Sequence, residues 1–237
     1  MSDFLIECRN LTHGYQRGGE FLTILDNLNL SIKQGDFVAL MGPSGSGKTT
    51  LLNLIGGLDK PVSGSIHIQG VELTNLPSKT ITNWRACTVG YIFQFYNLIP
   101  VLTAQANVEL PLLLTALSRL ERKRHAQTAL EIVDLADRAT HKPNELSGGQ
   151  QQRVAIARAI VADAQILVCD EPTGDLDRST ADDILSLLRT LNSKHGKTVI
   201  MVTHDLKAAE YAKTLLHMDK GALIQTDNKP ETFGVST

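Results

Sequence analysis

The feature of this sequence that most constrains its fold is a glycine-rich segment that reads Gly42-Pro43-Ser44-Gly45-Ser46-Gly47-Lys48-Thr49. It matches the pattern G-x-x-x-x-G-K-[ST] at every fixed position, and it lies between an apolar run at residues 37–41 and an amphipathic pattern at residues 50–55. Glycines let the backbone curl so that successive N–H groups point inward, and the following helix start adds the positive end of its dipole. The segment therefore predicts a nucleoside triphosphate site; the alternative is a Gly/Ser-rich turn that only joins a strand to a helix.

Three residues of this segment have distinct predicted roles. Lys48 supplies a positive charge for the β- and γ-phosphates, and the hydroxyl of Thr49 is suited to ligate Mg²⁺. We expect the remaining residues of the loop and Thr50 to complete the nucleotide contacts.

A second signal is an acidic pair that follows a buried strand. The apolar run I-L-V-C at residues 166–169 is followed directly by Asp170 and Glu171. Because ligands of open α/β sheets bind beyond the carboxyl ends of the strands, Asp170 is expected beside the phosphate loop. There it can hold Mg²⁺ through water, and Glu171 can act as the general base for an attacking water. Without the phosphate loop, the pair would be read as an ordinary surface turn.

A third signal is the pentapeptide Leu146-Ser147-Gly148-Gly149-Gln150, which precedes an apolar helical pattern. A serine and two glycines at a helix start form a second candidate phosphate site, because the first N–H groups of a helix have no partners within it. One chain would then have two phosphate-binding helix starts. Both can serve the same triphosphate only if the second comes from another copy of the chain.

The periodicity of the chain predicts an α/β fold. Continuous apolar runs at residues 37–41, 166–169 and 198–203 indicate strands covered on both faces, and residues 4–8, 23–32 and 65–69 indicate further strands. Helical spacing recurs between them, as at residues 126–133 and 184–191. Alternating strands and helices predict a parallel sheet with helices on both faces, interrupted by a helix-rich insertion at residues 95–161.

Composition excludes several classes of protein. The 23 Lys and Arg residues nearly balance 25 Asp and Glu residues, which argues against a chain that coats nucleic acid. A hydrophobic content of 42% argues against disorder. The 3 cysteines, Cys8, Cys87 and Cys169, form no C-x-x-C pair, so we expect a reducing compartment and neither a disulfide framework nor a zinc site.

The sequence also predicts that the chain does not cross a membrane. Its amino terminus has early acidic residues and only a short apolar run, which is not typical of a secretory signal. The longest uncharged stretch, residues 86–108, has the length of a membrane helix but contains glycine, proline and several amides. We interpret it as buried or interface-lining chain.

The three signals together, in this order, resemble the nucleotide-binding subunit of ATP-binding cassette (ABC) transporters, and the resemblance extends over residues 4–223. It implies a P-loop ATPase with a RecA-like parallel core, an N-terminal antiparallel β subdomain and an inserted helical subdomain. We expect one domain, 1–237, with the core at 4–94 and 162–224, the helical subdomain at 95–161 and a tail at 225–237. It also implies that two subunits sandwich two ATP molecules head to tail, and that each site is completed by the partner's signature, residues 146–150.

The resemblance implies roles for residues that carry little evidence alone. Tyr15 would stack on adenine, although it could be an ordinary surface aromatic residue. Gln94 would reach the metal and the γ-phosphate and report to the membrane partner, and His204 would contact the γ-phosphate; alone, either would be read as a polar residue at a strand end. The loop Gly174-Asp175-Leu176-Asp177 would cross between subunits. The predicted catalytic residues are Lys48, Gln94, Glu171 and His204, the metal ligands are Thr49, Gln94 and Asp170, and the ATP contacts in trans are Ser147, Gly148, Gly149 and Gln150.

Within this family the chain resembles the lipoprotein-releasing and macrolide-export (LolD/MacB-type) subfamily. The resemblance rests on Gly56-Gly57-Leu58-Asp59, on residues 93–100 and on residues 170–174. Members energise a four-helix membrane partner that transmits force to periplasmic substrates. Two segments depart from the pattern: Asp175 stands where asparagine is usual, and Gln105-Ala106-Asn107 replaces Leu-Glu-Asn in the segment expected to face the membrane partner.

The sequence therefore predicts an ATP- and Mg²⁺-dependent ATPase that powers a membrane transporter or force-transmitting complex. The expected partners are a second copy or a homologous ATPase subunit, and permease subunits near the Gln94 loop and the helical subdomain, with no nucleic acid. The expected location is peripheral, at the cytoplasmic face of the inner membrane, and the expected substrate is a lipoprotein, drug or other amphipathic molecule. The alternative is a soluble assembly ATPase of the iron–sulfur type; DNA-repair relatives are excluded because heptads and paired cysteines are absent between the motifs.

Overall fold

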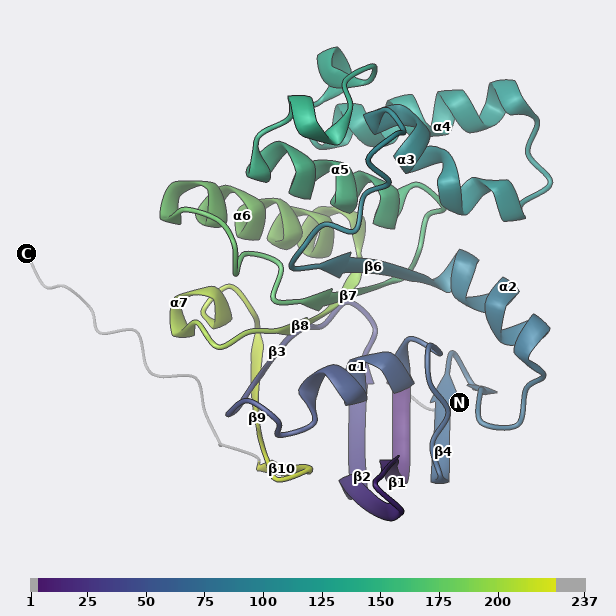
Figure 1. Ribbon diagram of the computed structural model, residues 1–237, viewed down its shortest axis with the longest axis vertical. Helices are drawn as coiled ribbons and strands as arrows, with labels where there is room; N and C mark the ends of the chain where they lie inside the picture. Colours follow the sequence, from purple (N-terminus) through teal and green to yellow (C-terminus); the bar gives the residue numbers. More distant parts are fainter. Residues whose placement is uncertain (1–3, 225–237) are drawn as a thin grey trace, which may run out of the picture.

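The computed structural model describes residues 4–224, so the predicted tail at 225–237 lies outside the described residues. The described chain forms a larger, mostly parallel sheet with helices on both faces, and a smaller antiparallel sheet that lies on one of these two sides (Figure 1). This arrangement confirms the predicted α/β fold with an N-terminal antiparallel part.

The larger sheet has the order β10-β9-β3-β8-β7-β6 within the described residues. Its strands are β3 (Phe37–Met41), β6 (Val89–Phe93), β7 (Ile166–Asp170), β8 (Thr198–Val202), β9 (Thr214–Asp219) and β10 (Ala222–Ile224). All neighbouring pairs are parallel except β9 and β10. The carboxyl ends of β3, β7 and β8 therefore meet at one edge, which is where the phosphate loop and the acidic pair begin.

Strand β3 shows why these segments read as continuous apolar runs. All of its residues are buried. Phe37, Ala39 and Met41 belong to the hydrophobic cluster on the helical side of the sheet, whereas Val38 and Leu40 belong to the cluster shared with the smaller sheet. A strand with both faces covered has no polar face, so alternation is lost.

The smaller sheet has the order β2-β1-β4-β5, and its pairs are antiparallel. Its strands are β1 (Phe4–Arg17), β2 (Glu20–Lys33), β4 (Ser63–Ile68) and β5 (Val71–Glu72). The strands expected at 4–8 and 23–32 were too short. Asn10 and Asn27 have positive φ values of 49° and 50° and mark irregularities in the β1–β2 register, so the simple alternation is interrupted although pairing continues.

The helices occupy the remaining segments of the described chain. They are α1 (Lys48–Ile55), α2 (Ser78–Thr88), α3 (Ala104–Glu109), α4 (Arg119–Ile132), α5 (Gly148–Ile160), α6 (Arg178–His195) and α7 (Leu206–Ala209), with 3-10 turns η1 (Leu110–Leu114), η2 (Ala136–Arg138) and η3 (Pro143–Glu145). The spacing at 126–133 and 184–191 falls on α4 and α6. In the described part of the chain, no helix has both the length and the apolar character needed to cross a membrane.

Helices α1 and α5 pack on opposite faces of the larger sheet. Buried residues of α1, such as Leu51 and Ile55, share a cluster with the antiparallel sheet, whereas Val154 and Ile156 of α5 share one with α4 and α6. Helix α5 packs directly on β6, because a Cβ added at Gly90 would collide with the carbonyl of Ala159. The expected boundary of a helical subdomain at 95–161 stays a prediction.

Candidate nucleotide-binding site

The glycine-rich segment forms an open loop between β3 and α1. Gly42 packs so closely against the backbone of Met218 in β9 that any Cβ would collide with its carbonyl oxygen, and Gly47 has a φ of 100°. Gly47 is the N-cap of α1 and provides no side-chain cap. The first N–H groups of α1 have no acceptor within the helix, so they are available to an anionic ligand.

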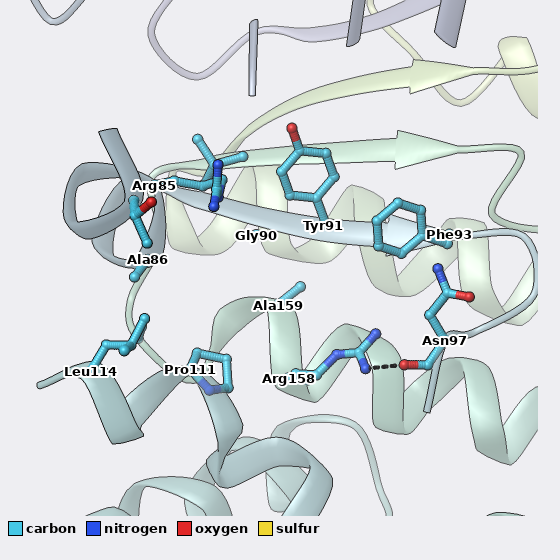
Figure 2. Close-up of a pocket in the computed structure, with 13 residues that line it drawn as sticks. Arg85, Ala86, Gly90, Tyr91, Phe93, Asn97, Pro111, Leu114, Arg158 and Ala159 are labelled. Carbon is cyan, nitrogen blue, oxygen red and sulfur yellow. Dashed lines mark hydrogen bonds between the residues drawn. The ribbon is translucent and has the colours of Figure 1, made fainter. Parts of the chain in front are cut away.

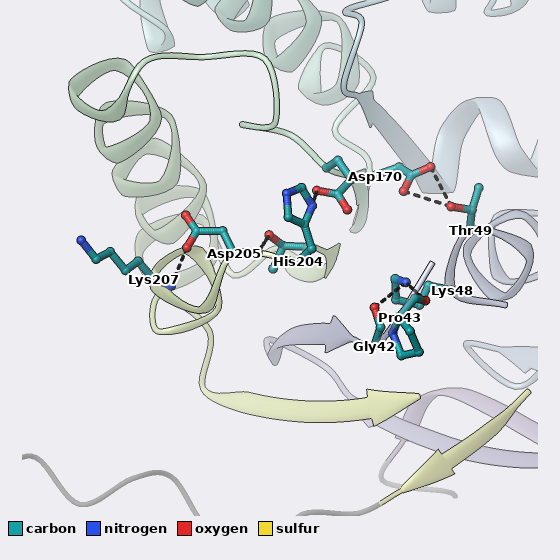
Figure 3. A network of polar contacts seen from close by, with 10 residues as sticks. Gly42, Pro43, Lys48, Thr49, Asp170, His204, Asp205 and Lys207 are labelled. Atoms are coloured by element: carbon teal, nitrogen blue, oxygen red, sulfur yellow. Dashed lines mark hydrogen bonds and ion pairs between the residues drawn. The ribbon is translucent and has the colours of Figure 1, made fainter. Parts of the chain in front are cut away.

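Lys48 holds the loop in shape. Its side chain is 9% exposed, and its ammonium donates to the carbonyl oxygens of Gly42 at 2.9 Å and Pro43 at 2.8 Å and lies 3.4 Å from Oγ of Ser46 (Figure 3). A buried cation is therefore compensated by the loop's own oxygens and lies beside the open helix start. This places a positive charge where phosphate groups would bind.

Thr49 and Asp170 join α1 to the end of β7. Oγ1 of Thr49 donates to both carboxylate oxygens of Asp170, at 3.2 Å each (Figure 3). Burial raises the pKa of Asp170, and the hydrogen bond from Thr49 opposes this shift. A hydroxyl and a carboxylate are oxygen ligands of the kind that Mg²⁺ binds together with phosphates and waters. Among residues 4–224 no group of three or more His, Cys, Asp or Glu side chains is placed to hold a metal ion.

Glu171 and His204 form an ion pair at the neighbouring strand ends. Glu171 has a positive φ of 50°, and its N–H donates to the carbonyl of Val202 at 3.0 Å. Its Oε2 lies 2.7 Å from Nδ1 of His204, and this interaction raises the pKa of His204. A non-glycine residue in this backbone region stores strain that is typical of functional sites.

These groups line one pocket of about 400 Å³. Its lining is Ile24, Gly42, Ser44, Gly45, Gly47, Lys48, Thr49, Thr50, Asp170, Glu171, Val202 and His204. The structure thus brings together most of the phosphate-loop residues with the acidic pair and His204. Of the remaining loop residues, Pro43 and Ser46 face Lys48.

Tyr15 and Gln94 lie outside this lining. The hydroxyl of Tyr15 donates to Oδ2 of Asp59 at 3.2 Å, its ring contacts that of His13 edge-on, and its side chain is 44% exposed. Gln94 follows β6, and its amide lies against Gly174, where a Cβ would be 2.9 Å from Nε2. Their predicted contacts with adenine, metal and γ-phosphate stay predictions.

The signature residues also lie apart from the pocket, at the start of α5. Ser147 is the N-cap: its Oγ accepts from the N–H of Gln150 at 3.3 Å, and Oε1 of Gln150 accepts from the N–H of Ser147 at 3.0 Å. Gly148 and Gly149 form the first turn between them. Because α5 and α1 pack on opposite faces of the larger sheet, residues 147–150 do not contribute to the pocket of their own chain.

Sequence reasoning missed Gln152, which joins the two strand ends. Its side chain is fully buried, and Nε2 donates to the carbonyls of Phe93 at 3.3 Å and Pro172 at 2.6 Å. The available signal was a glutamine on the otherwise apolar buried face of the helix. The sequence does not show which carbonyls such a residue meets.

A second cavity, of about 330 Å³, lies between α2 and β6 on one side and η1 and α5 on the other (Figure 2). Arg158 on its floor donates to the carbonyls of Tyr96 and Asn97, which lie two and three residues after Gln94. The nearby chain exposes Phe95 by 70%, Val101 by 75% and Leu114 by 62%. Exposed apolar side chains that gather beside a cavity are typical of a protein-binding surface.

Comparison with known proteins decides the family. Residues 25–174 match the family described as ABC transporter. The chain belongs to this family. It is 41% identical to the lipoprotein-releasing system ATP-binding protein LolD of Idiomarina loihiensis, over 94% of this chain and 98% of the relative. It is 43% identical to the macrolide export ATP-binding/permease protein MacB of Vibrio parahaemolyticus, over 94% of this chain but only 34% of the relative.

Comparison with solved structures supports the same family. The dimeric structure of the ATP-binding cassette MJ0796 of Methanocaldococcus jannaschii, in a post-hydrolysis state bound to ADP and Pi, has a TM-score of 0.86 and 45% identity, and the match covers 93% of this chain and 97% of that one. This chain is thus an ATP-binding, ATP-hydrolysing subunit of the ABC transporter family, and the resemblance to the LolD/MacB type is confirmed. The alternative, a soluble iron–sulfur assembly ATPase, is not supported.

Proposed function

We propose that this ABC ATPase works as a pair of identical copies arranged head to tail, each completing the other's ATP site. The observation that carries this proposal is that two glycine-rich helix starts, both candidate phosphate sites, belong to helices on opposite faces of one sheet. The open start of α1 binds the triphosphate in cis, and the start of α5, with Ser147, Gly148, Gly149 and Gln150, binds the partner's triphosphate in trans. The dimeric state described for MJ0796 supports this arrangement.

Within each site the residues have separate roles. Lys48 and the N–H groups of α1 bind the phosphates, and Tyr15 stacks on adenine. Thr49 and Asp170, with Gln94, hold Mg²⁺, which when bound neutralises charge on the phosphates. Glu171 accepts the proton of the attacking water as general base, and His204, whose Nδ1 lies 2.7 Å from Oε2 of Glu171, contacts the γ-phosphate. All of these charges lie in a pocket that closes on dimerisation, so they act on charge that develops during phosphoryl transfer.

We further propose that the groove of Figure 2 receives a cytoplasmic segment of a permease subunit. It borders the Gln94 loop through Asn97, so movement of that loop can pass to the partner. The names of the LolD and MacB relatives suggest export or extraction of a lipoprotein, drug or similar amphipathic substrate. Such a subunit would bind peripherally at the cytoplasmic face of the inner membrane.

Substitution Glu171→Gln tests the central proposal. It keeps the size of the side chain but removes the base, so we expect kcat to fall by about 10²–10⁴-fold while ATP binding is retained. Without hydrolysis the ATP-bound pair cannot reopen, so size-exclusion chromatography with light scattering should show a dimer in ATP and a monomer without it. A variant that stays monomeric at saturating ATP would contradict the head-to-tail site, and wild-type turnover would remove Glu171 from the base role.

A further inference from the structure

Gln152 connects three functional segments from inside the protein. It lies on α5, two residues beyond the signature, and its side chain has an exposed fraction of 0%. One amide nitrogen donates to the carbonyl of Phe93, which directly precedes Gln94, and to that of Pro172, which directly follows Glu171. A single buried group thus binds the backbone beside both candidate catalytic side chains.

The chemistry of these contacts fixes which way the amide points. Both partners are carbonyl oxygens, which only accept, so the NH₂ group must face them. Oε1 of Gln152 consequently lies on the other side, where it has no hydrogen-bond partner among the described residues. A buried polar group with an unpaired acceptor is unfavourable for stability, so its presence here points to a role other than packing.

Helix α5 contacts the backbone of strand β6 and of the loop that follows it at two further places. Gly90 in the middle of β6 touches the carbonyl of Ala159 so closely that no Cβ fits between them. Arg158 donates to the carbonyls of Tyr96 and Asn97. The chain from residue 90 to residue 97 is therefore held against α5, and Gln152 extends this attachment to the loop that follows Glu171.

We propose that Gln152 is a positioning residue for hydrolysis, which sets the placement of Glu171 and Gln94 according to the position of the signature helix. When the partner's triphosphate binds at the start of α5, the displacement of this helix reaches Glu171 through the Pro172 carbonyl and Gln94 through the Phe93 carbonyl. Each active site then senses whether the other is occupied. This inference rests on the proposed roles of Glu171 and the trans signature.

The test is Gln152→Met in the full-length protein, because methionine has a similar length and volume but donates no hydrogen bond. The substitution destabilises the protein because two buried carbonyls lose their donor, and it stabilises the protein because an unpaired buried oxygen is removed. These two effects oppose each other, so we expect a folded protein with a melting temperature near that of the wild type. A misplaced base lowers the rate of the chemical step, so kcat should fall by about 10–100-fold. KM for ATP, and binding of a fluorescent ATP analogue, should stay within about twofold of wild type.

Two controls separate this inference from its alternatives. Gln127→Met makes the same chemical change on α4, where Nε2 bonds Glu131 at 3.5 Å, and should leave kcat and KM unchanged. Glu171→Gln is measured in parallel and tests the underlying proposal. If this variant hydrolyses ATP normally, the proposed role of Glu171 is wrong. If Glu171→Gln is inactive and Gln152→Met is fully active, only the inference about Gln152 is overturned. If Gln152→Met does not fold, Gln152→Leu takes its place. Loss of folding in both variants would make Gln152 a structural residue and overturn the proposal.

Discussion

Two helices of this protein begin with glycine-rich sequences that we predict to bind phosphate, but the N–H groups of their first turns are capped differently. Helix α1 starts at Gly47 with no side-chain cap, and its first turn opens into the pocket. Helix α5 starts at Ser147, whose side chain and that of Gln150 bond each other's backbone N–H groups. The first is ready for a ligand in its own chain, whereas the second is already capped.

The difference suggests an order of events. A capped helix start is more stable than an uncapped one by about 1 kcal/mol, so α5 is stable before any nucleotide arrives. Helix α4 has the same capping box, made by Ser118 and Glu121, and no expected ligand. What distinguishes α5 is Gly148 and Gly149, which leave the backbone of the first turn uncovered by their own side chains. We therefore expect that the cis site is preformed and that the trans contact is added when the second copy docks.

The largest expected effect is on the cis helix start. Lys48→Met keeps the buried aliphatic stem but removes the ammonium that lies among the oxygens of the loop. Loss of one charged partner from a buried site typically costs 2–5 kcal/mol, so we expect ATP affinity to fall by on the order of 100-fold. Equilibrium binding of a fluorescent ATP analogue to the monomer measures this directly. Unchanged affinity would show that the pocket at α1 is not the nucleotide site.

A smaller effect on binding, but a large one on turnover, is expected at the trans helix start. Aspartate caps helices as well as serine does, so Ser147→Asp should preserve α5 while placing a carboxylate where the partner's triphosphate docks. Monomer affinity for ATP should stay at the wild-type value, and kcat should fall by on the order of 100-fold. Ser118→Asp is the matched control, because it makes the same exchange in the capping box of α4 and should not change kcat.

Mixing these two inactive variants makes the comparison sharper. In a head-to-tail pair of one Lys48→Met chain and one Ser147→Asp chain, both defects fall in one site and the other site is intact. Partial recovery of ATPase activity on mixing is therefore expected. No recovery, with mixed dimers detected, would mean that both helix starts act in one chain or that both sites must be intact.

The cis half of the site could be predicted from the sequence because its signals are local. A glycine pattern between an apolar run and a helix identifies the residues around Lys48, and parallel topology then places Asp170 and Glu171 beside them. The core strand β3 was predicted at its observed bounds for the same reason, since a doubly covered strand is a continuous apolar run. The antiparallel strands were less predictable, because the irregularities at Asn10 and Asn27 interrupt their alternation.

The side-chain contacts between segments far apart in the sequence could not be predicted. Gln152 meets carbonyls 59 and 20 residues away in sequence, and Tyr15 meets Asp59, 44 residues away. Such pairings depend on how helices and strands cross, and a single buried glutamine or exposed aspartate has no pattern that identifies its partner. The sequence identified candidate groups for the chemistry, and the fold determines which of them are held together.

The smallest expected effect is a pH dependence of stability, which we expect in the pocket at α1 but not at the capped start of α5. The pKa of His204 is raised above its ordinary value of 6.5 by the hydrogen bond and charge of Glu171. The charged pair therefore contributes stability that is fully present below pH 6.5 and is lost as the pH rises through the raised pKa. Because His204 is 73% exposed, water screens the pair and the contribution is small. The capping box at α5 contains no group that titrates in this range.

Urea unfolding of the nucleotide-free protein tests this expectation. The free energy of unfolding is measured between about pH 6 and pH 9 for the wild type and for two variants. His204→Asn should be less stable than wild type at the acidic end and approach it at the alkaline end, because wild type alone loses the charged pair. Ser147→Ala should lose about 1 kcal/mol at every pH, since a serine cap does not titrate. A pH-independent difference for His204→Asn would mean that the imidazole stays in one charge state throughout, and the contact with Glu171 would then act on geometry alone.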